Sequence, residues 1–298
     1  MTMKLSSIKY VISGVFVLGV IFSIILRVSE LINEIDPSTG FYKTGSVVVP
    51  VLNSILIMLV IIFLSPLFLK NDLESGVFSN KSKVNSILAG LLGVVLCIDA
   101  ASQFYSFIKE YSTGSADSGL FVAAMIEILA AIFFFILTEQ KLTGKKLNLA
   151  APALLPVLWG VVILGVSFMR YTSVANISEF LFDVLKMVFV LVFLYFNARA
   201  VGQISDKKEA KGIISFGLIA ALFCIVSSVP RTIAWIINHN NSYIPKVVND
   251  LLYLVFAIYI IDVIIEVLFE KRKIEEKLDV MDANIIIEEY EEQDEEDI

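Results

Sequence analysis

The sequence has a single histidine and two cysteines among its 298 residues, and this scarcity excludes several kinds of site. Because His239 stands alone, a mechanism that needs two imidazoles in one chain is excluded, and we expect no zinc site built from histidine and cysteine. Cys97 and Cys224 both fall in apolar stretches without a CxxC spacing, so we predict no disulfide. We accordingly predict no metal and no cofactor.

Catalytic, cofactor-binding and nucleotide-binding motifs are also missing from the sequence. Intramembrane hydrolases and lipid transferases need a nucleophile in a recognisable setting or a carboxylate cluster at the membrane face, and the sequence offers neither. The DxxD spacings, Asp279 with Asp282 and Asp294 with Asp297, lie in a polar tail. We predict that the protein is not an enzyme. We also predict no nucleic-acid partner, because membrane topology already explains the basic residues.

Charge is scarce as well, whereas apolar residues are abundant. Only 18% of the residues are charged and 57% are hydrophobic, with a mean hydropathy of +0.83, which is too apolar for a soluble domain of this length. The apolar residues gather in segments long enough to cross about 30 Å of hydrocarbon as helices. We therefore predict an all-α, polytopic membrane protein with a lipid bilayer as its solvent. Its eight transmembrane helices are expected at 10–32, 47–69, 85–108, 119–138, 152–170, 178–198, 213–236 and 248–269.

The distribution of lysine and arginine predicts how these helices are oriented. The termini and the loops after the even-numbered helices hold 16 basic residues, against six in the loops on the other side. By the positive-inside rule, the side that is rich in lysine and arginine faces the cytoplasm. Both termini are on that side, and the loops with few basic residues are expected outside the cell. The chain is thus expected to lie in the cell membrane as four helical hairpins, each crossing outward and returning.

The acidic residues are concentrated in the last part of the sequence. Residues 1–274 have a net charge of +4, whereas residues 275–298 have a net charge of −11. We therefore divide the chain into a transmembrane domain, 1–269, and a cytoplasmic segment, 270–298. That segment is expected to begin as a charged helix and to end as a disordered acidic tail, which could hold a cytoplasmic protein partner.

Charged residues inside transmembrane helices are costly and are functional candidates by default. Asp99 and Gln103 fall on one face of the third predicted helix, and Glu127 lies on an alanine-rich face of the fourth. Asp183 and Lys186 lie on the sixth. Counting 1.5 Å per residue places Asp99, Glu127 and Lys186 at a similar depth, which predicts a polar layer in the outer half of the bundle. The solute- or ion-binding candidates are Asp99, Glu127, Lys186, Asp183, Gln103, Arg170 and Arg231.

Three interpretations of this polar layer stay open. In a structural interpretation, Asp183 pairs with Lys186 and the other carboxyl groups bond to neighbouring side chains. In a functional one, the layer lines an outward-facing cavity where Lys186, Arg170 and Arg231 meet an anionic group, while Asp99 or Glu127 carries a proton or a cation. In the third, the charges form a network that switches between two arrangements.

Other charged residues near helix ends are not predicted to form sites. Asp262, Glu266 and Glu270 form a stripe that descends to the inner surface, so a solvated or snorkelling helix end is expected there. Arg27, Glu30 and Glu34 likewise mark the outer exit of the first helix.

The leading functional hypothesis is a multi-pass membrane protein that binds or transports a small solute through a polar cavity in its outer half. The alternative is a membrane sensor, or an assembly or scaffold subunit, that signals through its cytoplasmic tail. Truncation after Lys277 distinguishes the two hypotheses, because a transporter should tolerate it and a sensor or scaffold should not.

Overall fold

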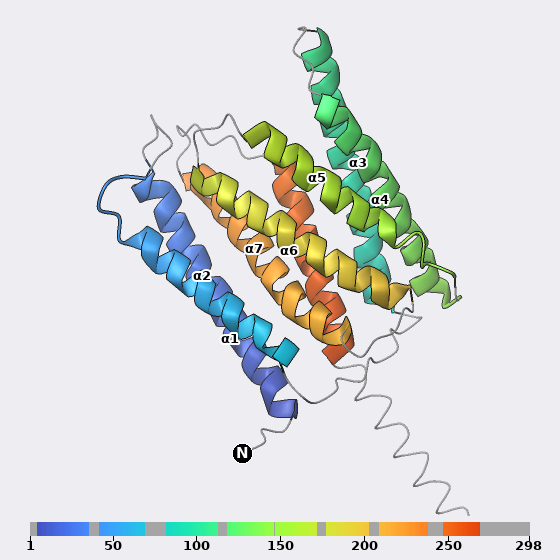
Figure 1. The fold of residues 1–298 in the computed structure, drawn as a ribbon, viewed down its shortest axis with the longest axis horizontal. Helices are drawn as coiled ribbons and strands as arrows, with labels where there is room; N and C mark the ends of the chain where they lie inside the picture. The colour runs from blue at the N-terminus through green and yellow to red at the C-terminus, as the bar shows by residue number, and fades with distance from the viewer. Residues whose placement is uncertain are drawn as a thin grey trace, which may run out of the picture.

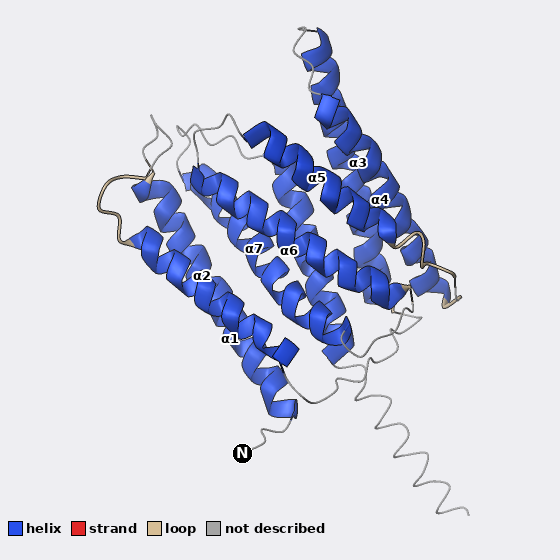
Figure 2. Ribbon diagram, in the orientation of Figure 1, coloured by secondary structure: helices blue, strands red, loops and turns tan. Residues whose placement is uncertain are grey.

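The computed structural model describes residues 5–35, 42–68, 82–112, 118–145, 147–171, 177–202, 209–237 and 247–268. Apart from one isolated bridge between Ile35 and Tyr42, the regular structure of these residues is helical (Figure 2). The predicted all-α class is confirmed. The predicted charged helix and acidic tail, 270–298, lie outside the described residues, as does His239.

The helices follow one another along the chain as long rods (Figure 1). Helix α1 is continued by a single π-helical segment, η1, and α2 by a short 3-10 segment, η2. The last described helix, Val247–Leu268, is called the 247–268 helix below. The other elements are α1 (Leu5–Ser29), η1 (Glu30–Glu34), α2 (Val48–Leu64), η2 (Ser65–Phe68), α3 (Lys83–Ser112), α4 (Ser118–Thr143), α5 (Leu154–Tyr171), α6 (Ile177–Val201) and α7 (Glu209–Ile237).

Seven of the described helices are long and apolar enough to cross a membrane. The eighth apolar stretch, Leu154–Met169 in α5, is shorter. Helix α5 itself spans 18 residues, with Pro156 in its first turn, where proline is tolerated because no backbone hydrogen bond is lost. The chain is thus a multi-pass membrane protein.

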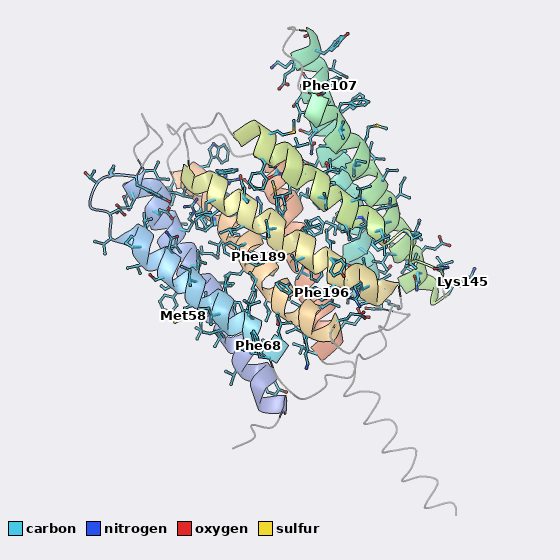
Figure 3. All side chains as sticks on the ribbon, viewed as in Figure 1. Met58, Phe68, Phe107, Lys145, Phe189 and Phe196 are labelled. Carbon is cyan, nitrogen blue, oxygen red and sulfur yellow. The ribbon has the colours of Figure 1, made fainter. Side chains whose placement is uncertain are left out.

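Several helices extend beyond the predicted apolar segments into polar sequence. Helix α4, predicted to end at 138, runs to Thr143, and α7, predicted to begin at 213, starts at Glu209. Hydropathy detects only the part of a helix that suits hydrocarbon, whereas backbone hydrogen bonding continues through polar residues. Figure 3 shows Phe107 and Lys145 at opposite ends of the α3–α4 hairpin.

The packing order places α7 at the centre and α1 and α2 at one side of the bundle. Helix α7 packs against α6, α1 and α2, and α5 lies between α4 and α6. In its most apolar part, α7 is 83% buried, against 22% for α1 and for α2. The 247–268 helix runs behind α5 and α6 in Figure 1. Its side chains contact α3, α4, α5, α6 and α7, so it touches most of the elements that carry the candidate residues.

A glycine allows the 247–268 helix to approach α7 closely. A Cβ atom added at Gly217 would stand 2.9 Å from Ile264 and 3.2 Å from Phe193 of α6. Real Cβ contacts are seldom that short, so a larger side chain at this position would push the helices apart. Small residues at helix crossings are a common feature of membrane proteins.

Candidate functional site

One polar cluster lies between α3 and α4 and contains two carboxyl groups. Gln103 Nε2 donates hydrogen bonds to Asp99 Oδ2 and to Glu127 Oε2, each at 2.8 Å. Asp99 is 5% exposed and Glu127 is fully buried. We call these three residues the carboxyl cluster. The shared amide confirms the prediction that the α3–α4 hairpin brings Asp99 and Glu127 to one level.

The sequence around Glu127 explains how the carboxyl cluster forms. Ala123, Ala124, Ala130 and Ala131 are all buried on the side of α4 that carries Glu127. Small side chains let two membrane helices pack closely, so the Glu127 side chain reaches α3. Glu127 Oε1 is buried and has no hydrogen-bond partner. The cluster therefore keeps an acceptor that the surrounding protein does not satisfy.

A second cluster joins α6, α7 and the 247–268 helix through four charges. Lys186 Nζ lies 2.8 Å from Asp183 Oδ1, and Arg231 Nη2 lies 3.3 Å from the same oxygen. Arg231 Nη1 lies 2.8 Å from Asp250 Oδ1. All four residues are buried. We call them the outer ion network, after the predicted orientation of the chain. Each cation of this cluster lies beside an anion, as buried ion pairs require.

The ring of Tyr253 contacts the outer ion network. Lys186 Nζ stands 3.9 Å from the centroid of the Tyr253 ring, a favourable position for a cation. Tyr253 is itself buried, so little water screens this interaction.

A further ion pair is buried at the end of α1. Arg27 Nη1 lies 2.6 Å from Glu30 Oε1, and the Arg27 guanidinium lies 4.0 Å from the centroid of the Phe182 ring. The Tyr42 hydroxyl also donates to Glu30. Arg27 and Glu30 are buried, so they do more than mark the outer exit of the first helix. Arg27 thus contacts Phe182, the residue directly before Asp183 of the outer ion network.

A third polar cluster lies at the opposite end of the 247–268 helix and corrects a prediction. Lys141 Nζ lies 2.7 Å from Glu266 Oε1, and both side chains are at least nine-tenths buried. Asn85 Nδ2 donates to Asp262 Oδ2 at 3.0 Å. The prediction of a solvated or snorkelling stripe is wrong for Glu266, because α4 supplies a buried cation and α3 an amide for this helix face. We call these four residues the inner polar cluster.

The structure therefore unites six of the seven candidate residues in two clusters. The pairing of Asp183 with Lys186 at i,i+3 is confirmed. Arg170 stands in α5, but its side chain lies outside the described part of the chain. The face of α3 that carries Asp99 was also predicted to include Ser102 and Ser106; Ser102 is exposed, and Ser106 is half-buried like Gln103.

Four participants were missed by reasoning from the sequence: Asn85, Asp250, Tyr253 and Lys141. Asp250 and Lys141 stand near helix ends, where charged residues are usually solvated. The spacing gives no shared face, because the nine residues from Tyr253 to Asp262 make two and a half turns, which puts Asp250 and Tyr253 on the opposite side of the helix from Asp262 and Glu266. Their partners come from other helices and could not be read from this spacing.

These arrangements define what the site can do chemically. The carboxyl cluster offers two acidic groups and one unsatisfied acceptor, which suits a proton or a cation. The outer ion network offers balanced charges on three helices, which can exchange partners when those helices move. Comparison of the chain with protein-family models, with curated proteins and with solved structures finds no match.

Proposed function

We propose that this multi-pass membrane protein carries a small solute across its membrane and couples that movement to a proton or cation at the carboxyl cluster. The proposal rests on one observation: inside the bundle, the Gln103 amide donates hydrogen bonds to both Asp99 and Glu127. Two acidic groups at that depth are costly, and such groups in membrane proteins commonly mark ion pathways and proton relays.

The outer ion network supplies the part that would respond to the carboxyl cluster. Lys186 lies against the buried ring of Tyr253. Because charges act over longer distances in a medium of low dielectric, a change of charge at the carboxyl cluster would alter the field in which Lys186 and Asp183 are paired. Because Arg231 joins Asp183 to Asp250, that change reaches α6, α7 and the 247–268 helix together. Movement of these helices would open the polar layer in the outer half of the bundle to a solute.

Electrical recordings from reconstituted protein test this proposal. Proteoliposomes are adsorbed to a solid-supported membrane and exposed to amino acids, sugars, nucleosides and organic acids under an imposed pH or sodium gradient. At least one of these classes of compound should produce a transient current. Glu127→Gln should reduce the current by at least about tenfold, a factor that corresponds to about 1.4 kcal/mol.

The matched control is Glu139→Gln, which makes the same change at an exposed position of the same helix. It should leave the current unchanged. A current that survives Glu127→Gln, or an equal loss in both variants, would contradict the proposed role of the carboxyl cluster.

A sensor is the second candidate function, and the pairing within the outer ion network favours it. All four charges already satisfy one another in the buried state, as expected of an element that switches between two sets of partners. Truncation after Lys277 separates the candidates. A carrier keeps its solute-driven current without residues 278–298, whereas a sensor that acts through its tail produces no such current and loses its cytoplasmic output.

A further inference from the structure

A single amide nitrogen stands between the two carboxyl groups of the carboxyl cluster. Gln103 Nε2 lies 2.8 Å from Asp99 Oδ2 and 2.8 Å from Glu127 Oε2. A side-chain amide nitrogen carries two hydrogens and acts only as a donor. Its two hydrogens are therefore shared between the two carboxyl groups, and the nitrogen takes the position from which a bound cation would bridge them.

The Gln103 amide keeps a metal ion out of this position. Hard cations such as calcium are held by oxygen ligands at about 2.3–2.6 Å. An ion in contact with both Asp99 and Glu127 would have to stand where the Gln103 nitrogen lies, and the amide hydrogens would repel it. The amide thus opposes a metal ion both by its volume and by the sign of its partial charge.

The backbone of α3 and α4 keeps its carbonyl groups occupied around the carboxyl cluster. Helix α3 is continuous over Lys83–Ser112 and α4 over Ser118–Thr143. Within an unbroken helix each carbonyl accepts a hydrogen bond from the residue four positions later. Many secondary transporters coordinate their ions with carbonyl groups of unwound helices. On α3 and α4 the ligands of the cluster therefore have to come from side chains.

The surroundings of Glu127 favour a bound proton. Its side chain is fully buried, Oε2 accepts a hydrogen bond from a neutral amide, and Oε1 has no hydrogen-bond partner. An ionised carboxyl group is costly in such surroundings, and a bound proton removes its charge. Two ionised carboxyl groups on one amide would also repel each other. The charge of Glu127 acts further on the Cys97 thiol and the Tyr253 hydroxyl, which are neutral around neutral pH and supply no cation.

We propose that the carboxyl cluster binds a proton and not a metal ion, and that Gln103 determines this selectivity because its amide occupies the position of a cation. The inference rests on the proposed function, since it names the ion that this site couples to solute movement. Proton uptake forms an O–H bond on Asp99 or Glu127 with a proton taken from water, and release returns that proton to water. No other bond changes.

Thermal unfolding of the purified protein in detergent micelles tests the selectivity without any solute. The unfolding midpoint is compared in choline chloride, sodium chloride and lithium chloride at equal ionic strength. The wild-type midpoint should be the same in all three salts. In Gln103→Ala the space between the carboxyl groups admits a cation and water. Sodium or lithium should then raise the midpoint by at least about 2 °C, because a ligand that binds only the folded state stabilises it.

Gln140→Ala is the matched control for this measurement. Gln140 is another glutamine of the α3–α4 hairpin and is buried, but it lies about 20 Å along α4 from Glu127. Its midpoint should not depend on the salt. A wild-type protein that sodium or lithium stabilises, or a Gln103→Ala protein that neither stabilises, overturns the proposal. Gln103→Ser, whose small side chain also leaves the space open, replaces Gln103→Ala if the alanine variant does not fold.

Infrared spectroscopy tests the bound proton directly. A protonated carboxyl group has a C=O stretching band that is separate from the bands of carboxylates and amides. At neutral pH, the difference spectrum between the wild type and the double variant Asp99→Asn, Glu127→Gln should contain this band. The difference spectrum between the wild type and Glu139→Gln, a change at an exposed position of α4, should lack it. Absence of the band from the first spectrum would show that the carboxyl cluster holds no proton.

The outcomes separate this inference from the proposed function. A carboxyl cluster that is protonated and insensitive to sodium and lithium supports the proton selectivity even if no solute drives a current. A solute current that a sodium gradient drives in the wild-type protein would leave the carrier proposal standing and reject the proton-selective site.

Discussion

At the scale of single residues, the charges of this protein depend on partners that lie far away in the sequence. Arg231 holds Asp250 at 2.8 Å and Asp183 at 3.3 Å, and all three residues are buried. A buried ion pair adds little stability over apolar residues of similar size, but removal of one partner is costly because the other charge stays in a medium of low dielectric. We therefore infer that the outer ion network contributes mainly to specificity, because it determines which helices lie in contact.

Arg231→Met should lower the free energy of unfolding by about 3–5 kcal/mol, because it takes away the guanidinium that Asp250 and Asp183 share. Unfolding in detergent micelles with increasing denaturant measures the change. The double variant Arg231→Met, Asp250→Asn should recover part of the loss. Lys43→Met, at an exposed lysine, serves as the control and should cost about 1 kcal/mol or less. Equal losses at the two positions would refute the network's contribution.

At the scale of elements, hydropathy predicted the helices well but not their ends or contacts. The eight predicted segments all correspond to helices, because each helix satisfies its backbone internally whatever surrounds it. The depth argument correctly joined Asp99 to Glu127, since the two belong to one hairpin. It could not find Lys141 and Glu266, which are 125 residues apart and meet only because α4 lies beside the 247–268 helix.

Gly217→Val should destabilise the protein by about 1–3 kcal/mol, because the added atoms would meet Ile264 and Phe193 across two helix contacts. Thermal unfolding in micelles checks this. Gly14→Val is the matched control, since nothing lies within 4 Å of a Cβ atom added there, and its effect should stay within about 0.5 kcal/mol. If the two variants were equally stable, α7 would not pack as closely as described.

At the scale of the whole molecule, the polar groups are arranged in two levels along the 247–268 helix. The outer ion network binds that helix to α6 and α7, and the inner polar cluster binds it to α3 and α4. Phe256, whose ring contacts Phe134 and Trp159, lies between these levels. One helix thus has charged contacts with different neighbours at its two ends, which is an arrangement suited to alternating movement.

The predicted orientation has its own test in intact bacterial cells that express the protein. In a background with Cys97→Ala and Cys224→Ala, Lys43→Cys should react with a membrane-impermeant thiol reagent added outside. Lys145→Cys should react only after the cells are opened, because the positive-inside rule puts that connection in the cytoplasm. The reverse pattern would show that both termini face outward.

The sequence alone determined the solvent of this protein, its helical class and the approximate helix positions, because hydropathy and backbone hydrogen bonding act over short stretches of chain. It also singled out the charges that are expensive in a bilayer. Only the tertiary structure decided which charge meets which: Arg231 with Asp250, Lys141 with Glu266, and Gln103 with both carboxyl groups of its cluster. The physical reason is that ion pairs and hydrogen bonds require contact within about 3 Å. Such contact depends on the packing of helices that are distant in sequence, and a local pattern does not encode that packing.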